Sequence, residues 1–91
     1  MKPKTNKEAL NDQVQIHLSK ALDIDGTKVS TLTMREPTVN DQLIAAESGS
    51  TDAMQEVAIM ANLCMVSTAD IRKMSLRDYK KLQTAYVAFT S

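Results

Sequence analysis

The stretch TLTMREPTVNDQL, residues 31–43, decides how this chain folds, because it changes from the periodicity of a strand to that of a helix. Leu32 and Met34 alternate with threonines, which is typical of a strand with one buried face. Pro37 ends the strand, since proline has no amide hydrogen for the ladder and disfavours a helical conformation in the residue before it. The stretch therefore predicts a corner between a strand and a helix.

The helix after this corner has its own start signal. Thr38 stands where an N-cap belongs, and Asp41 three residues later completes a capping box. We predict a helix over residues 39–48, which the small and polar residues at 48–51 end. The side chains that we expect this helix to bury are Val39, Leu43 and Ile44.

Arg35 and Glu36 lie at the corner itself, where an adjacent basic and acidic residue suggest a catalytic pair. No motif places a second carboxylate or a histidine beside them, so acid–base chemistry is not favoured. We expect the two residues to fix the angle between the strands and the helices through a salt bridge of Arg35. Contact with a partner is the alternative.

Upstream of the corner the pattern is that of a β-hairpin. Apolar and polar residues alternate over residues 13–18, 21–25 and 27–34, which predicts two or three short strands. Asp25 and Gly26 favour the positive φ angles of a tight turn. A lone hairpin is only marginally stable in water, so helices must cover its apolar face.

Three further helices are predicted downstream, over residues 52–65, 68–74 and 76–89. The last two each open with a Ser-x-x-Asp capping pattern, beginning at Ser67 and Ser75. The apolar positions of the last helix are Leu76, Tyr79, Leu82, Tyr86 and Phe89, and its residues expected to face water are Arg77, Lys80 and Lys81.

These elements predict a single α+β domain, because 91 residues suffice for one domain at most. Its architecture is a small N-terminal antiparallel β-hairpin or meander packed on three to four α-helices. The hairpin part spans residues 13–36 and the helical part residues 37–91. Residues 1–12 are polar and lysine-rich, and we expect them to form a flexible N-terminal tail.

The composition argues against several classes of protein. The 11 basic residues balance 11 acidic ones, whereas binding to nucleic acid or to an anionic membrane would favour a positive excess. The single cysteine allows no internal disulfide. No stretch has the pattern of a signal peptide or a membrane span. We therefore expect a cytoplasmic protein with no nucleic-acid or membrane partner.

The sequence contains no recognisable catalytic or metal-binding pattern. His17 is the only histidine and is expected on the polar side of a strand, and Cys64 is expected to be a buried, inert thiol. The aspartates at positions 23 and 25 lack the other acidic ligands of a calcium loop. Two glycines cannot make a phosphate-binding glycine loop. We expect no enzymatic activity, no cofactor and no metal.

The helix predicted over residues 52–65 is apolar on nearly all sides. Such a helix is either central or covered by a second molecule, and so short a chain offers few elements to cover it. We therefore expect a partial protein–protein surface, with self-association through residues 54–65 and the last helix. The candidate partner-binding residues are Met54, Val57, Ile59, Met60, Leu63, Tyr86 and Phe89.

The order of these motifs resembles one family, in which a strand closes on Leu-x-Leu-Arg-Glu-Pro-Thr-x-x-Asp and the last helix carries Leu-x-x-x-Asp-Tyr-x-x-Leu. The residues that match the two patterns are Leu32, Met34, Arg35, Glu36, Pro37, Thr38 and Asp41, then Met74, Asp78, Tyr79 and Leu82. Methionine replaces an aliphatic residue once in each. Over residues 14–90 the chain thus resembles the tail assembly chaperones of Mu-like and related contractile-tailed bacteriophages, the "E, or 41, or 14" group.

This resemblance implies a protein that is not an enzyme. Such chaperones bind the tape measure protein, a long and mostly helical chain, and keep it soluble until tail tube subunits polymerise around it. The implied partners are the tape measure protein and the tail tube protein, in the host cell cytoplasm and not in the mature virion. The alternative is a small helical DNA-binding or regulatory protein, whose phosphate contacts would be Arg72, Arg77, Lys80 and Lys81.

Overall fold

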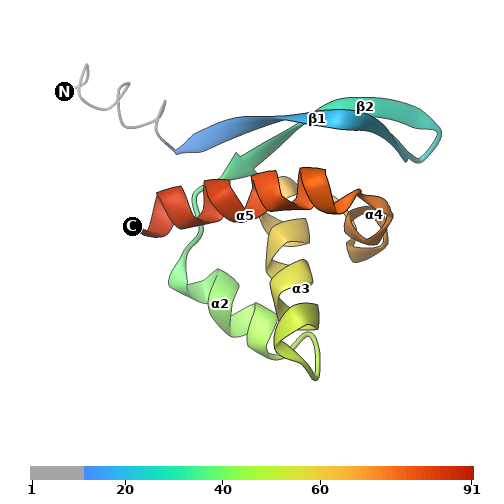
Figure 1. Cartoon of the computed structure of the whole chain (residues 1–91). Coiled ribbons are helices and arrows are strands. Elements are labelled where there is room, and N and C mark those ends of the chain that lie inside the picture. The colour runs from blue at the N-terminus through green and yellow to red at the C-terminus, as the bar shows by residue number, and fades with distance from the viewer. Residues whose placement is uncertain (1–11) are drawn as a thin grey trace, which may run out of the picture.

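The computed structural model describes residues 12–91, which form a β-hairpin followed by four helices (Figure 1). The elements are β1 (Gln13–Ile24), β2 (Thr27–Arg35), α2 (Val39–Ala46), α3 (Asp52–Cys64), α4 (Thr68–Lys73) and α5 (Leu76–Thr90). This order confirms the predicted α+β class with a hairpin ahead of the helices. The flexible tail predicted for residues 1–12 lies outside the described residues, apart from Asp12.

The hairpin is antiparallel, and its turn lies at Asp25 and Gly26 as predicted. The φ angles of these residues are 53° and 85°, in the left-handed region that an Asp-Gly pair tolerates in a two-residue turn. β1 is one continuous strand of 12 residues. The prediction of separate strands over 13–18 and 21–25 is therefore wrong.

β1 contains a bulge where the sequence suggested a gap between strands. The pairing register with β2 shifts between His17 and Leu22. Across this shift residues 18–21 of β1 lie opposite only Ser30 of β2. A bulge of this kind bends the strand and leaves backbone amides without a partner in the ladder. These amides need acceptors from elsewhere in the chain.

The corner after β2 has the predicted structure. Thr38 caps α2 with an extended backbone, at φ −118° and ψ 167°. Its Oγ1 accepts a hydrogen bond from the amide of Asp41 at 3.3 Å, and the Asp41 carboxylate accepts one from the amide of Thr38 at 2.8 Å. Both hydrogen bonds of the capping box are thus present. α2 ends at Ala46, two residues before the predicted end of the helix.

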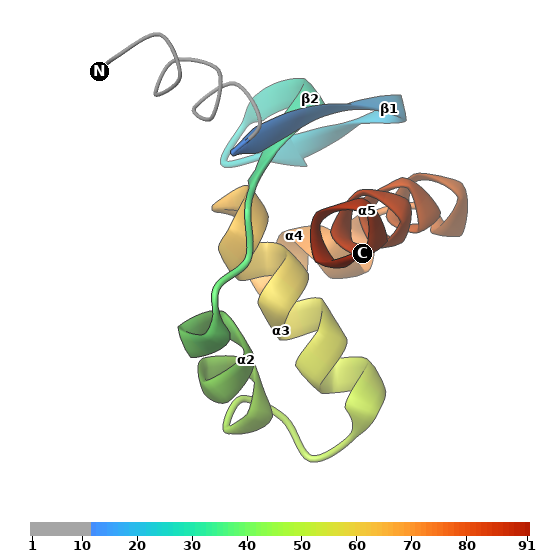
Figure 2. The ribbon, with the colours of Figure 1, turned by 90° about the vertical axis from the view of Figure 1, so that its left-hand side faces the viewer.

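α3 is the central helix, with the hairpin near one end and α2 and α5 on either side (Figure 2). Met60 and Leu63 of α3 are buried in the same apolar cluster as Met34 of β2 and Leu82 of α5. The inner face of the hairpin and the apolar face of α5 therefore help to cover a helix for which the sequence suggested little cover within the chain.

α2 differs most from its prediction. Val39, Leu43 and Ile44 are 74%, 60% and 44% exposed, so the prediction that they are buried is wrong. The buried residues of α2 are Asp41 and Ala45, one turn apart. α2 packs mainly against α3, and a helix of eight residues with one neighbour buries only a narrow face. The larger apolar side chains therefore point to solvent.

The predicted starts of α4 and α5 are confirmed. Ser67 Oγ accepts a hydrogen bond from the amide of Asp70 at 3.0 Å, and Ser75 Oγ accepts one from the amide of Asp78 at 3.2 Å. These caps satisfy amides that have no partner within the helix. Leu76, predicted to be an apolar position of the last helix, is exposed and lies outside the core.

Candidate functional site

Arg35 and Asp41 join the end of β2 to the first turn of α2. Arg35 Nη1 lies 2.8 Å from Asp41 Oδ2, and Nη2 lies 2.8 Å from Oδ1. The amide and the hydroxyl of Thr38 also donate to this carboxylate. The hydrogen bonds from Arg35 and then Thr38 hold the pKa of Asp41 well below its usual range, although burial opposes the shift. The hydrogen bond with Asp41 in turn raises the pKa of Arg35.

The other residues of the corner play smaller parts. The side chain of Glu36 is exposed, and its amide donates to the carbonyl oxygen of Asp12 at 2.7 Å. Pro37 is half-buried between β2 and α2. The expected Arg35 salt bridge is therefore present, and its partner is the capping residue Asp41 rather than its neighbour Glu36.

Asp78 joins α5 to the bulge of β1. Its Oδ1 accepts from the amide of Ser19 at 2.8 Å, and its Oδ2 accepts from the amide of Lys20 at 3.2 Å. Asp78 is almost fully buried. The hydrogen bond from Ser19 is the main reason that its pKa lies well below the usual range, and the ammonium of Lys81, 3.4 Å away, adds to the effect. This aspartate supplies the acceptors that the bulge requires.

Tyr79 joins α5 to α3. Its hydroxyl donates to Glu56 Oε2 at 2.6 Å, and Gln83 Nε2 donates to the same oxygen at 2.8 Å. Burial, together with the neighbouring carboxylate, raises the pKa of Tyr79. The aspartates and the tyrosine of the motifs thus each connect two elements, and nothing in their geometry resembles an acid–base pair aimed at a substrate.

Three of the predicted partner-binding residues are buried within the chain. Ile59, Met60 and Leu63 are 7%, 2% and 0% exposed. Their assignment to an open surface is corrected, because the hairpin, α2 and α5 cover α3. Met54 is 47% exposed, and the half-buried residues of the set are Val57, Tyr86 and Phe89. For these four, partner contact stays a prediction.

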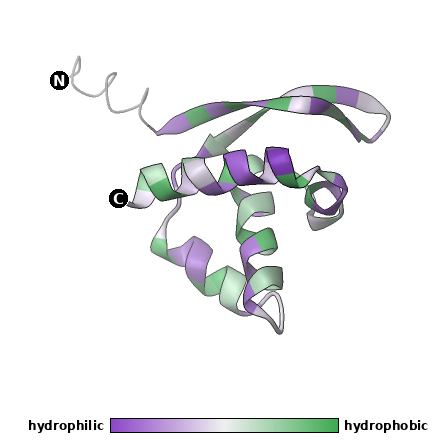
Figure 3. Cartoon of the chain, in the orientation of Figure 1, coloured by the Kyte–Doolittle hydropathy of each residue, from purple (hydrophilic) through white to green (hydrophobic). Residues whose placement is uncertain are grey.

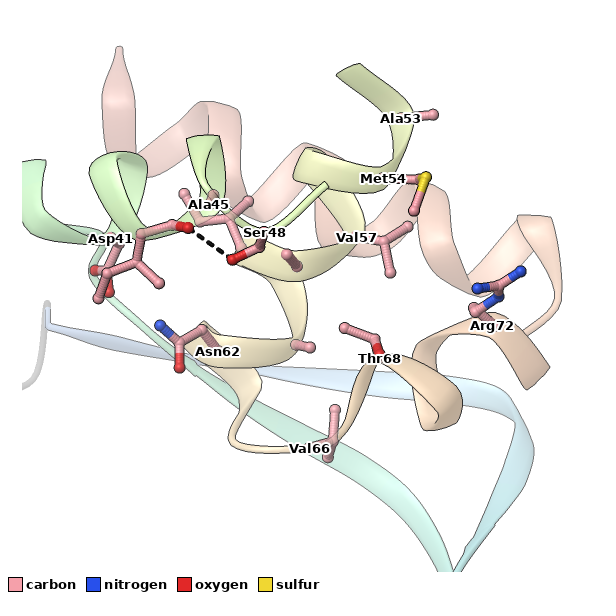
Figure 4. A pocket seen from close by; sticks show the side chains of 14 residues that line it. Asp41, Ala45, Ser48, Ala53, Met54, Val57, Asn62, Val66, Thr68 and Arg72 are labelled. Carbon is pink, nitrogen blue, oxygen red and sulfur yellow. Dashed lines mark hydrogen bonds between the residues drawn. The ribbon is translucent and has the colours of Figure 1, made fainter. Parts of the chain in front are cut away.

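Sequence reasoning missed an open groove that is bordered by α2, α3 and α4 (Figure 4). Its volume is about 510 Å³, and its lining includes Ile44, Met54, Val57 and Arg72. The hydropathy colouring of α2 and α3 shows apolar segments that reach the end of the molecule away from the hairpin (Figure 3). The available signal was the spacing in α2: Asp41 and Ala45 share one face, which places Leu43 opposite that face and Ile44 at its edge.

A second groove, of about 530 Å³, lies on the other side of α2, toward α5. Tyr86 and Val87 of α5 line it together with Gln42 of α2, whose Nε2 donates to Tyr86 Oη at 3.3 Å. Val87 is 60% exposed. α2 is therefore flanked by open surface on both sides, and apolar side chains remain exposed on each.

The residues considered for other chemistry do not form a site. His17 is exposed, with Nδ1 3.3 Å from Thr31 Oγ1. Cys64 is buried, and burial raises the pKa of its thiol to about 11, which leaves it protonated at neutral pH.

No group of three or more His, Cys, Asp or Glu residues within 12–91 is placed to hold a metal ion. In the same part of the chain, no helix is both long and apolar enough for a membrane span.

Of the basic residues considered for phosphate contact, Lys81 points back to the hairpin. Its Nζ donates to the carbonyl oxygen of His17 at 2.7 Å. Arg72 lines the groove beside α3 instead of sharing a face with α5. Arg72 therefore stands apart from the three basic residues of α5, none of which lines this groove.

The comparison with known proteins agrees with the motifs. The sequence profile of the phage tail assembly chaperone proteins, E, or 41 or 14, matches residues 15–91. That range covers nearly all of β1 and every later element. No curated protein and no solved structure matches the chain. Membership in such a family implies interaction with tail proteins and suggests a protein without catalytic activity. The chain belongs to the phage tail assembly chaperone family.

Proposed function

We propose that this protein binds the tape measure protein of its phage and keeps it soluble until tail tube subunits polymerise around it. The family supports a role in tail assembly. The apolar surface at α2 and α3 supports the further step to a chaperone that holds helical segments. Grooves of this kind receive the apolar face of an amphipathic helix through anchors one turn apart.

The observation that carries the proposal is the outward placement of the apolar side chains of α2. Val39, Leu43 and Ile44 are exposed, and Ile44 lines the same groove as the exposed Met54 of α3. Exposed apolar side chains that gather in one region are typical of interaction surfaces. Met54 adds a flexible side chain that adapts to varied partners, which suits a client with many different helical segments.

The proposal includes where the protein acts. The chaperone works in the host cell cytoplasm, is released before the tail is complete, and is absent from the mature virion. The tail tube protein is a further partner, which displaces the chaperone as the tube grows. Mass spectrometry of purified virions is expected to detect the tape measure protein without this chain, and finding this chain in stoichiometric amount would contradict that part.

Co-expression tests the binding itself. The tape measure protein of the same gene cluster is produced alone, with this protein, and with an unrelated helical protein of similar size. We expect soluble tape measure protein only with this chain, and co-purification of the two. Tape measure protein that stays insoluble in every case, with no complex, would contradict the proposed function.

A further inference from the structure

The groove bordered by α2, α3 and α4 has an apolar lining made largely of small side chains (Figure 4). Its alanines are Ala45, Ala53, Ala58 and Ala61. Two larger apolar residues of the lining, Ile44 and Met54, are 44% and 47% exposed. Since the distance between packed helices depends on the side chains at the contact, small residues let another helix approach closely. The lining thus has the character of a helix-packing surface that lacks its partner helix.

The groove carries charge at both ends, and within residues 12–91 only the charge of Arg72 lacks an ion-pair partner. In Figure 4, Asp41 lies at one end and Arg72 at the other. The Asp41 carboxylate is occupied by Arg35 and Thr38. The ion pairs of residues 12–91 do not include Arg72, whose neighbour Lys73 takes the nearby Asp70. An incoming chain therefore meets a mainly apolar lining and, among residues 12–91, one positive charge that no described carboxylate pairs.

We propose that this groove receives the apolar face of an amphipathic helix of the tape measure protein, and that a carboxylate of that helix pairs with Arg72. The inference rests on the proposed function and adds which surface is used and what the client helix carries. Because Arg72 lies at only one end of the groove, the ion pair between Arg72 and the client carboxylate also sets the direction in which the client helix lies. A charge at the edge of an apolar contact contributes more to orientation than to affinity.

Photo-crosslinking tests the surface. p-Benzoylphenylalanine is placed at Ala53 or at Thr68, which line the groove from α3 and α4, and at Ser30 on the exposed side of the hairpin as a control. Each variant is co-expressed with the tape measure protein and irradiated. We expect crosslinks to the tape measure protein from Ala53 and Thr68 but not from Ser30, and mass spectrometry then identifies the crosslinked segment.

The outcomes separate this inference from the function on which it rests. A soluble complex that crosslinks from Ser30 and not from the groove would overturn the inference and leave the proposed function intact. Crosslinks from the groove to a second copy of this chain would also overturn it. Absence of any complex would contradict the proposed function, and this inference with it.

The charge is tested with a synthetic peptide of the crosslinked segment. Arg72→Glu is compared with Arg77→Glu, an equal change at an exposed position of α5 outside the groove. We expect Arg72→Glu to weaken peptide binding about fivefold, as for one exposed ion pair, and Arg77→Glu to leave it unchanged. A peptide with its acidic residue changed to lysine should restore binding to Arg72→Glu. Equal effects of the two variants, or no restoration, would overturn the pairing.

Discussion

Arg35 and Asp41 form two hydrogen bonds of 2.8 Å across the corner between β2 and α2. Asp41 also completes the capping box of α2, so one buried carboxylate both starts the helix and attaches it to the hairpin. At the other end of the chain, the amide of Asp78 donates to the cap residue Ser75 in the first turn of α5, and its carboxylate accepts from the bulge of β1. The family motifs therefore supply two of the points at which the hairpin is attached to the helices.

Replacing Arg35 by alanine should destabilise the protein. The change leaves the nearly buried Asp41 carboxylate without its two strongest donors. Because Arg35 itself is partly exposed, we expect a loss of about 1–2 kcal/mol in the free energy of unfolding. Urea unfolding measures it, with Arg77→Ala as the control. A variant as stable as the wild type that no longer binds its partner would show instead that Arg35 is a contact residue.

Replacing Asp78 by asparagine should loosen the bulge of β1. The amide side chain keeps one acceptor oxygen, but it cannot accept from both Ser19 and Lys20 as the carboxylate does. Hydrogen exchange is expected to become faster at these two amides, with a loss of stability. Asp70→Asn makes the same change at the corresponding position of the first turn of α4, where the carboxylate accepts from Ser67 of its own cap, and it should leave exchange at Ser19 and Lys20 unchanged. Unchanged protection at Ser19 and Lys20 in Asp78→Asn would contradict this role.

Acid should weaken the fold through the same two aspartates. The pKa values of Asp41 and Asp78 lie below the ordinary 3.8 in the folded protein. Such groups contribute stability that is complete above their unfolded pKa and is lost as the pH falls toward the folded value. The free energy of unfolding should therefore decrease below about pH 4, as measured by urea unfolding across the acid range. In Asp41→Asn, the free energy of unfolding should fall less steeply with decreasing pH than in the wild type. An equally steep fall would exclude a contribution of the Asp41 carboxylate to acid sensitivity.

Replacing Gly49 by alanine should disturb the turn between α2 and α3. A Cβ atom at this position would lie 2.7 Å from the Cβ of Met54, so the loop must move. Overpacking of this kind costs about 1–3 kcal/mol, and here it would shift α2 relative to α3. Thermal unfolding checks the loss, with Ser50→Ala in the same loop as the control. Equal stability of the two variants would mean that α2 adjusts freely.

The features that the sequence predicted correctly depend on neighbouring residues. The turn at Asp25 and Gly26, the end of β2 before Pro37, and the cap at Thr38 are each determined within a few residues by φ preferences and side chain to backbone hydrogen bonds. For this reason the fold class and the helix starts could be predicted from one sequence. The salt bridge of Arg35 could also be expected, since its partner is only six residues away.

The features that the sequence did not predict depend on distant contacts. β1 continues through its bulge with acceptors from Asp78, which is 59 residues beyond Ser19. Likewise, Met60 and Leu63 are buried by the hairpin and α5, whose positions are set by tertiary packing. The same packing leaves Leu43 and Ile44 outside. The hydrophobic pattern of a sequence shows which faces of an element are apolar. It does not show which of those faces the other elements will cover in the folded chain.

The solubility of the tape measure protein in the presence of Ile44→Asp tests the central claim most directly. Ile44 is 44% exposed and lines the groove, and a carboxylate in the last turn of α2 opposes the helix dipole at a cost of about 0.3–1 kcal/mol, so urea unfolding first confirms that the variant is folded. Asn40→Asp adds the same charge to the same helix at another exposed position and serves as the control. Co-expression with Ile44→Asp should leave the tape measure protein insoluble, whereas Asn40→Asp should keep it soluble. A folded Ile44→Asp variant that keeps the tape measure protein as soluble as the wild type does would contradict the account.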